Sequence, residues 1–431
     1  MPSSDPSSTS PGDNPNRFGA LSVSSFRYYW SGNLILLLGM QMQRIAVGWE
    51  IWKRTQSAAA LAWIGLVGVL PTILLTLVVG HVADRFDRKA IIGVTSLVLA
   101  AAAVGLAVVS YDQGPILATY GFLLASGIAR AFQRPAQQAL VPVIVPPETL
   151  FNAITLNSSA FQIATAVGPA LGGVIIAVGG TAPVYLVQAV AAVVCFVLLF
   201  GVRGRNAAAR GQVATLQTLM AGVVFVFRNQ VLLGALALDL FAVLLGGATA
   251  LFPIYAESIL HVGATGLGWM ETAQAVGALA MAFWLASRPA MERSGATMLW
   301  AVAGFGLATI VFGISRWFGL SLAMLFLVGA FDNISVVVRQ TLIQMLTPDE
   351  MRGRVSAVNS MFIGTSNDLG AVESGLVASF TTPTISVVAG GCGTIVVVAL
   401  AAVIWPKLRR YGRLDGRAPE TRENPLPVEA Q

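Results

Sequence analysis

Charged and amide side chains lie in the middle of apolar stretches of this chain, and these are the residues that could do chemistry. A charge inside a membrane is costly, so such residues usually bind a substrate, pair with an opposite charge or carry a proton. The candidates for substrate binding or coupling are Gln41, Gln43, Arg44, Arg130, Gln133, Asp239, Glu271, Asp332, Asn333 and Asp368. Other polar groups in these stretches are Arg134, Gln274, Arg339 and Glu373.

A carboxylate that carries a proton must be desolvated enough for its pKa to approach neutrality, and it must face the two sides of the membrane in turn. Asp239 and Asp332 are the first candidates for this role, and Glu271, Asp368 and Glu373 follow them. The sequence alone does not rank these five carboxylates further.

Four other charged residues are not expected to bind substrate or carry a proton. Arg134 and Arg339 lie near the end of their apolar stretches, so we expect their long side chains to extend to the aqueous interface. Glu50 and Glu257 lie near the opposite ends, and we expect them to be interfacial.

The elements that position these residues are predicted to be membrane-spanning helices. Of the 431 residues, 56% are hydrophobic and 11% are charged, whereas a soluble protein carries about 25% charged residues. A spanning helix needs roughly 20 apolar residues, so the composition allows roughly twelve spans. A soluble globular fold, a disordered chain, a disulfide scaffold and a coiled coil are excluded.

Apolar runs separated by charged or Gly/Pro-rich breaks predict twelve helices in two halves of six. The first half covers residues 26–202 and the second 229–407, with a cytoplasmic linker at 203–228, a disordered N-terminal tail at 1–25 and a basic tail at 408–431. The predicted helices are 29–52, 59–83, 89–110, 115–137, 150–178, 182–202, 229–256, 264–287, 295–316, 319–343, 352–379 and 383–407.

The positive residues predict the orientation in the membrane. With the N-terminus inside, the external loops carry only Lys53, Arg54 and Arg316, and most other basic residues fall inside. The net charge of +6 therefore reflects topology rather than a nucleic-acid partner. Both termini are expected in the cytoplasm.

The two halves resemble each other at an offset of about 202 residues. Asn157-Ser158 falls on Asn359-Ser360, Gly168 on Gly370 and Gly173 on Gly375. A six-plus-six duplication is typical of rocking transporters, whose binding site lies between the halves near mid-membrane.

The turn at Gly80–Lys89, GHVADRFDRK, resembles the cytoplasmic signature G-x-x-x-D-R-x-G-R-K of the major facilitator superfamily, with Asp87 where the family usually has Gly. The resemblance implies an all-α membrane fold, and it places the start of the eleventh helix beside Asp84. We expect a latch that favours the outward-open state, made of Gly80, Asp84, Arg85, Arg88, Lys89 and Arg354. The alternative is a solvated turn that only enforces topology.

Gly168, Pro169, Gly172 and Gly173 resemble the end of the superfamily's antiporter motif, G-x8-G-x3-G-P-x2-G-G. Its upstream glycines are replaced by the small residues Thr155 and Ala164. Within the superfamily this motif goes with exporters. The alternative is ordinary small-residue packing between helices.

Three further segments resemble the enterobactin-exporter-like branch of the superfamily, which also includes macrolide and multidrug efflux proteins. They are Phe26–Asn33 (FRYYWSGN), Arg134–Pro142 (RPAQQALVP) and Thr347–Val355 (TPDEMRGRV). The resemblance runs from Phe26 to about Trp405 and implies transport, with export as the expected direction.

The repeat places Arg130 and Asp332 at equivalent depths on the fourth and tenth helices. The resemblance implies that these helices line a central cavity. The two charges could pair in one conformation and separate in the other, or each could neutralise a local partner.

The expected function is secondary active export of a small amphipathic compound, such as a siderophore, a macrolide or another drug, by proton antiport. An importer or uniporter of the same fold, or a transport-dead sensor, is the alternative. An enzyme is not expected, because the chain has neither H-E-x-x-H nor G-x-S-x-G. None of the three lysines completes a phosphate-binding G-x-x-x-x-G-K-[ST] loop, so a proton gradient is the expected energy source.

No cofactor and no metal site are expected, because His81, His261, Cys195 and Cys392 are isolated from one another. The expected partners are the small-molecule substrate, protons and membrane lipid, without nucleic acid. We expect a monomer in the bacterial cytoplasmic membrane.

Overall fold

The computed structural model describes residues 19–203, 216–289 and 291–412, and every regular element within these ranges is helical. The side chains of residues 69, 72–73, 76–78, 80–81, 83–85 and 216–219 are outside the description. Most of both predicted tails and part of the predicted linker also lie outside the described residues.

The first half forms six long helices that agree with the predicted ranges to within a few residues, apart from one. They are α2 (Ser24–Thr55), α3 (Ala58–Arg85), α4 (Arg88–Tyr111), α5 (Ile116–Ile144), α6 (Leu150–Gly179) and α7 (Thr181–Leu199). The exception is α5, which was expected to end at 137. It continues through Pro135 and Pro142. Proline is tolerated inside a membrane helix because neighbouring helices can satisfy the backbone groups that it leaves unbonded.

The second half forms α9 (Gln230–Gly246), α11 (Gly263–Ala286), α12 (Ser294–Ile314), α13 (Phe318–Leu346), α14 (Asp349–Phe380) and α15 (Pro383–Ile404). Shorter elements are α1 (Gly19–Ser22), η1 (Pro147–Thr149), α8 (Leu216–Arg228) and α16 (Pro406–Arg409). In the described ranges nine helical spans are long and apolar enough to cross a membrane. The chain is thus a multi-pass membrane protein, consistent with the twelve expected spans.

The prediction of one regular helix over 229–256 is wrong. The helix α9 ends before Gly247, and the chain continues through η2 (Ala248–Leu251), α10 (Phe252–Ile254) and the π-helical η3 (Tyr255–Ile259). Gly247 has a non-helical backbone conformation, and Pro253 has no N–H to donate. The regular pattern of α-helical backbone hydrogen bonds is therefore interrupted between residues 247 and 253.

Asp87 departs from the family's Gly because it caps a helix. Its carboxylate accepts the backbone N–H groups of Lys89 at 3.4 Å and Ala90 at 3.3 Å, at the start of α4. An acidic N-cap stabilises a helix start by about 1 kcal/mol relative to Ala. Asp87 therefore helps to fix the start of α4 and the conformation of the turn before it.

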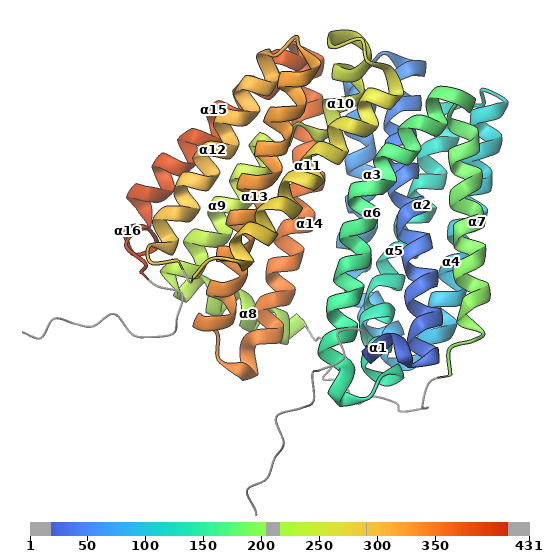
Figure 1. Ribbon diagram of the computed structural model, residues 1–431, viewed down its shortest axis with the longest axis horizontal. Coiled ribbons are helices and arrows are strands. Elements are labelled where there is room, and N and C mark those ends of the chain that lie inside the picture. Colours follow the sequence, from blue (N-terminus) through green and yellow to red (C-terminus); the bar gives the residue numbers. More distant parts are fainter. Residues whose placement is uncertain (1–18, 204–215, 290, 413–431) are drawn as a thin grey trace, which may run out of the picture.

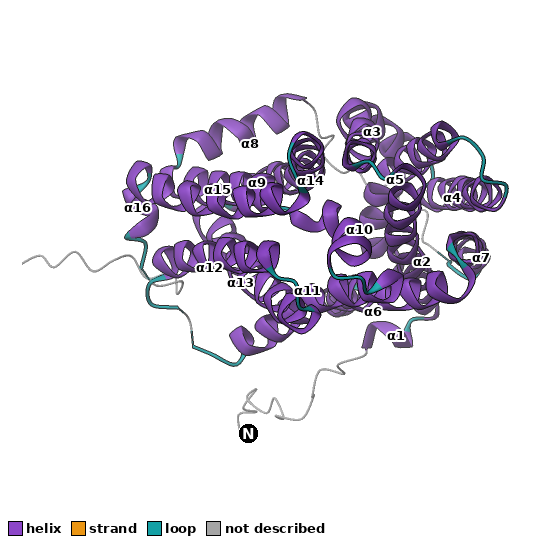
Figure 2. Cartoon of the chain, turned by 90° about the horizontal axis from the view of Figure 1, so that it is seen from above, coloured by secondary structure: helices purple, strands orange, loops and turns teal. Residues whose placement is uncertain are grey.

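The two groups of helices lie side by side, with α2–α7 in one and α9 and α11–α15 in the other (Figures 1 and 2). We call the end of the bundle that carries Lys53 and Glu257 the Lys53 end, and the opposite end, with the turn before α4, the Arg88 end. A single apolar cluster at the Lys53 end includes Trp49 and Leu61 from one half and Phe252 and Phe312 from the other. The two main clusters toward the Arg88 end each belong to one half.

Glycines at repeat-related positions bring the helices together. A Cβ on Gly173 of α6 would lie 2.6 Å from the carbonyl oxygen of Ala264 on α11, and a Cβ on Gly375 of α14 would lie 2.9 Å from that of Ala58 on α3. Both contacts join the two halves. Within each half, Gly168 approaches Leu38 of α2 and its equivalent Gly370 approaches Leu244 of α9. The sequence repeat therefore has a counterpart in the helix packing.

The contact at Gly173 generates a test of the closure. Gly173→Ala should push α6 from α11 at a cost of about 1–3 kcal/mol, lowering the closed-to-open ratio at the Lys53 end about fivefold or more. Spin labels at the exposed positions Tyr111 and Phe380, in a Cys195→Ala, Cys392→Ala background, would report the distance between the halves by electron resonance.

Gly121→Ala is the matched control, because a Cβ there would have no atom within 4 Å. A distance distribution that Gly173→Ala leaves as narrow and as short as the control would contradict the role given to this contact.

Candidate functional site

A polar network joins the halves in the part of the bundle toward the Lys53 end. Arg44 on α2 forms an ion pair with Glu271 on α11, and its Nε donates to Gln41 Oε1 at 3.3 Å. Gln41 Nε2 in turn donates to Thr165 Oγ1 on α6 at 2.7 Å. The Arg44 side chain is 49% exposed and the Glu271 side chain 9%. The pair therefore has one side buried between the halves and one side open to solvent.

Two more polar contacts hold the Lys53 end together. Lys53 Nζ lies 2.7 Å from Glu257 Oε1, so Glu257 is paired across the halves as well as being partly exposed. Thr272 Oγ1 on α11 donates to the carbonyl oxygen of Ala166 on α6 at 2.9 Å. All these contacts must break if the Lys53 end opens.

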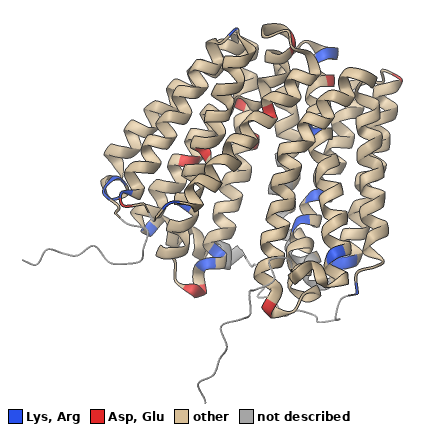
Figure 3. Cartoon of the chain, in the orientation of Figure 1, with Lys and Arg blue, Asp and Glu red and all other residues tan. Residues whose placement is uncertain are grey.

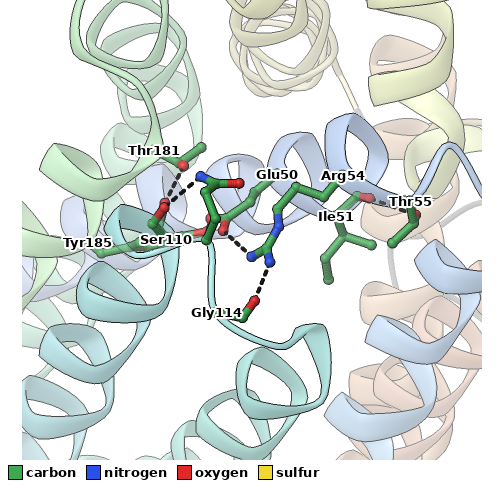
Figure 4. Close-up of polar contacts among 9 residues, drawn as sticks. Glu50, Ile51, Arg54, Thr55, Ser110, Gly114, Thr181 and Tyr185 are labelled. Atoms are coloured by element: carbon green, nitrogen blue, oxygen red, sulfur yellow. Dashed lines mark hydrogen bonds and ion pairs between the residues drawn. The ribbon is translucent and has the colours of Figure 1, made fainter.

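The prediction that Glu50 is interfacial is wrong, because it lies buried inside the first half (Figure 4). Tyr185 Oη on α7 donates to Glu50 Oε2 at 2.8 Å, and Arg54 Nη1 lies 3.1 Å from Glu50 Oε1. Arg54 also donates to the carbonyl oxygen of Gly114 before α5. Arg54 compensates the buried charge, so Glu50 fixes α2, α7 and this loop as one unit.

Arg339 does not extend to the aqueous interface as expected. It is 1% exposed and forms an ion pair with Asp239, which lies on the facing helix α9. Pairing of the Arg339 guanidinium with the buried Asp239 carboxylate is therefore favoured over solvation of the guanidinium at the aqueous interface. In the first half Gln137, the repeat equivalent of Arg339, donates from Nε2 to Asn33 Oδ1 at 3.0 Å, so a polar link joins the same two helices in each half.

Asp332 lines a cavity in the second half together with Gln274, Asn367 and Thr249. The cavity holds about 70 Å³ of space for water, which suffices for a few water molecules but not for a drug-sized compound. A smaller cavity beside it is lined by both Asp332 and Asp239. In the described part of the chain Asp332 forms no ion pair.

Neighbouring polar atoms of α13 are also unsatisfied. The buried oxygens Asn333 Oδ1 and Ser335 Oγ have no hydrogen-bond partner within the described ranges. Buried polar groups are usually bonded, so this region can accept water, a proton or a ligand group.

Arg130 on α5 interacts electrostatically with Asp368 on α14 and with Arg134. Neither Arg130 nor Asp332 forms an ion pair among the described residues, so their pairing stays a prediction for another conformation. The side chains of Arg130 and Arg134 are both exposed.

Two predicted glutamines have different surroundings. Gln133 is buried, and its Nε2 donates to Ser96 Oγ at 3.2 Å, which links α5 to α4. Gln43 is half-buried and forms no hydrogen bond in the described part of the structure. Their role toward a substrate stays a prediction.

The predicted latch falls partly outside the description, because the side chains at Gly80, Asp84 and Arg85 are not described. Arg88 donates to the carbonyl oxygen of Ala139 at 3.2 Å and Lys89 to that of Val202 at 2.9 Å, both within the first half. Arg354 Nη1 lies 3.4 Å from Met351 Sδ on its own helix. The latch stays a prediction.

The residues of the glycine-proline motif lie where α6 meets its neighbours. Gly168 and Gly172 face α2, and Gly173 faces α11. The carbonyl oxygen of Pro169 would lie 2.5 Å from a Cβ on Gly268 of α11. The motif thus packs against both halves, in the part of α6 that also receives Thr272.

Sequence reasoning missed the pairs Lys53–Glu257 and Asp239–Arg339. A signal for the second was present, since Arg339 falls on Gln137 at the repeat offset and both positions are polar within apolar helices. The described residues contain no group of three or more His, Cys, Asp or Glu side chains that could hold a metal.

The two ion pairs between the halves should not contribute equally to closure. Arg44→Gln leaves the mostly buried Glu271 without a cation, which is costly, whereas Lys53→Gln removes an exposed pair of small net effect. In the spin-labelled protein, Arg44→Gln should open the Lys53 end severalfold more than Lys53→Gln. Equal effects would show that burial of Glu271 does not control the closure.

Within the second half, the buried Asp239–Arg339 pair should stabilise the protein more strongly than the exposed Asp349–Arg352 pair. Asp239→Asn or Arg339→Gln alone should destabilise the protein by about 3–5 kcal/mol, because one charge stays buried and uncompensated. The double variant should recover part of this loss. Thermal unfolding in detergent measures it, and the exposed Asp349–Arg352 pair, 2.6 Å apart, is the control. Additive losses in the double variant would count against a direct interaction.

Comparison with known proteins gives the family. Residues 16–429 match the MFS_3 family, described as transmembrane secretion effectors. The chain is 25% identical to the enterobactin exporter EntS of Shigella boydii serotype 4 (strain Sb227) over 394 residues, which cover 90% of this chain and 93% of that protein. The enterobactin exporter EntS of Escherichia coli O1:K1 / APEC is 25% identical over 392 residues, with the same coverage.

Solved structures share the fold. A bacterial homologue of the human lysosomal transporter Spinster, inward-facing and unoccupied, has a TM-score of 0.68 and 14% identity, over 92% of this chain and 99% of that one. A D-xylose–proton symporter has a TM-score of 0.68 and 13% identity, over 91% and 99%. The chain therefore belongs to the MFS_3 family of transmembrane secretion effectors and has the fold of major facilitator superfamily transporters.

Proposed function

We propose that this protein is a secondary active exporter that moves a small amphipathic compound out of the cytoplasm by alternating access and proton antiport. The observation that carries the proposal is the one-sided closure of the halves. Among the described residues, contacts between the halves concentrate at the Lys53 end, where they combine an apolar cluster, glycine contacts and the Arg44–Glu271 pair. A closure of this kind can be exchanged for one at the Arg88 end by rocking.

The positive residues support the orientation in this proposal. Arg88 and Lys89 lie at the Arg88 end, as does the basic segment after α15, so this end faces the cytoplasm and both termini are cytoplasmic. The conformation is then closed to the outside. The protein resides in the bacterial cytoplasmic membrane, and a monomer contains both halves of the site.

Export is supported by the Gly168–Gly173 segment and by the relatives described as enterobactin exporters. A siderophore, a macrolide or another drug is the proposed class of substrate. The family consists of secretion effectors, so we propose transport without catalysis and without a resident cofactor or metal.

We assign the coupling proton to Asp332 rather than to Asp239. Arg339 compensates the charge of Asp239, whereas Asp332 has no cation partner among the described residues and lines a cavity that can hold water. An unpaired carboxyl group is least costly inside the protein when it carries a proton. Rocking would expose this group to each side in turn, so that inward proton movement drives outward movement of the substrate.

Everted membrane vesicles with an imposed inside-acid pH gradient test this function. Uptake of enterobactin or erythromycin should exceed that of vesicles without the protein, and Asp332→Asn should reduce gradient-driven uptake about tenfold or more. Exchange of labelled for unlabelled compound at equal pH should persist in Asp332→Asn, because exchange needs rocking but no net proton movement.

Asp349→Asn, an exposed carboxylate at the start of α14, is the control. Uptake only when the gradient is reversed would indicate an importer. Full gradient-driven uptake by Asp332→Asn would remove Asp332 from the coupling step.

A further inference from the structure

The charges within the spans that lack an ion pair differ in sign between the two halves. Figure 3 shows Lys and Arg segments within the first half and Asp and Glu segments within the second at mid-height of the bundle. The Arg44–Glu271 and Asp239–Arg339 pairs account for some of them. Away from the helix ends, the charges within the spans that form no ion pair among the described residues are Arg130, Arg134, Asp332, Asp368 and Glu373.

Arg130 and Arg134 lie one helical turn apart on α5. Neither forms a hydrogen bond or an ion pair in the described part of the chain, and both side chains are exposed. Both guanidinium groups are therefore accessible and, among the described residues, have no bonded partner.

Asp368 belongs to the other half and lies against α3, which packs against the helix α5 that carries the two arginines. Its carbonyl oxygen lies 2.7 Å from the position of a Cβ on Gly65, and its Oδ1 lies 3.9 Å from that of a Cβ on Gly68, so two glycines of α3 leave room for it. It interacts electrostatically with both Arg130 and Arg134. The absence of an ion pair among these three means that a gap separates the carboxylate from the guanidinium groups.

We propose that Arg130 and Arg134 bind an acidic group of the transported compound, and that Asp368 is the internal counter-ion with which this group competes. The inference rests on the proposed transport function and adds the substrate class, an organic anion. Guanidinium groups match carboxylates and similar oxyanions by paired hydrogen bonds. Two like charges one helical turn apart repel each other, and a bound anion relieves that repulsion.

Competition with Asp368 gives the site a link to rocking. With no anion bound, the attraction between Asp368 and the arginines draws α14 toward α5 across the halves. A bound anion satisfies the arginines and weakens this attraction. Occupancy of the site and the relative position of the halves thus depend on the same charges.

Binding of a matched pair of aromatic probes to the purified full-length protein in neutral detergent tests the inference. The anion 1-naphthoate and the cation 1-naphthylmethylammonium share one ring system and differ in charge. Isothermal titration should show binding of naphthoate in preference to the cation. Arg130→Gln should weaken naphthoate binding about tenfold, and Arg130→Lys should weaken it less. Asp368→Asn should strengthen it about threefold or more.

The opposite signs for Arg130→Gln and Asp368→Asn separate a binding site from a purely structural contact, which would weaken binding in both variants. Arg288→Gln, an exposed arginine at the end of α11, is the control and should leave binding unchanged. Thermal unfolding of each variant identifies those that are folded.

Equal binding of the two probes, or weaker naphthoate binding by both folded variants, would overturn the inference. So would displacement of naphthoate by phosphatidylglycerol at lower concentration, which would assign the arginines to a lipid headgroup. The titration needs no flux, so anion binding with no vesicle transport would contradict only the proposed function. Vesicle transport without anion preference would contradict only this inference.

Discussion

The closure of the two halves at the Lys53 end is the contact on which the rest of the structure depends. Membrane helices gain little from burying apolar side chains in each other rather than in lipid, so their association relies on close packing and on polar contacts. Here the glycine contacts of α6 and α14 provide the close packing, and the Arg44–Glu271 pair provides the polar contact. Because both kinds of contact are local, they can break without disturbing either half.

Each half has its own internal links that do not depend on this closure. Glu50, Arg54 and Tyr185 tie α2 to α7 in the first half, and Asp239 with Arg339 ties α9 to α13 in the second. These charges are buried and compensated, so they resist rearrangement. The molecule therefore has two firm bodies and one breakable interface, which is the arrangement that rocking requires.

The sequence predicted most of the helices and the two-fold repeat, because these depend on apolar length and on residue spacing. It did not predict which charges pair. Glu50 and Arg339 were misplaced, because a partner on a neighbouring helix, Tyr185 or Asp239, cannot be identified from position along one helix. The break after α9 was missed because Gly246-Gly247 and Pro253 lie in an otherwise continuous apolar run.

The central claim is that closure alternates between the two ends. Labels at Tyr111 and Phe380 report the Lys53 end, and labels at Phe151 on α6 and Trp284 on α11 report the Arg88 end. Distances for both pairs, measured by electron resonance in lipid nanodiscs over a range of pH, test the claim directly. The account predicts that one distance lengthens as the other shortens. Distances that stay constant, or that lengthen together, would contradict it.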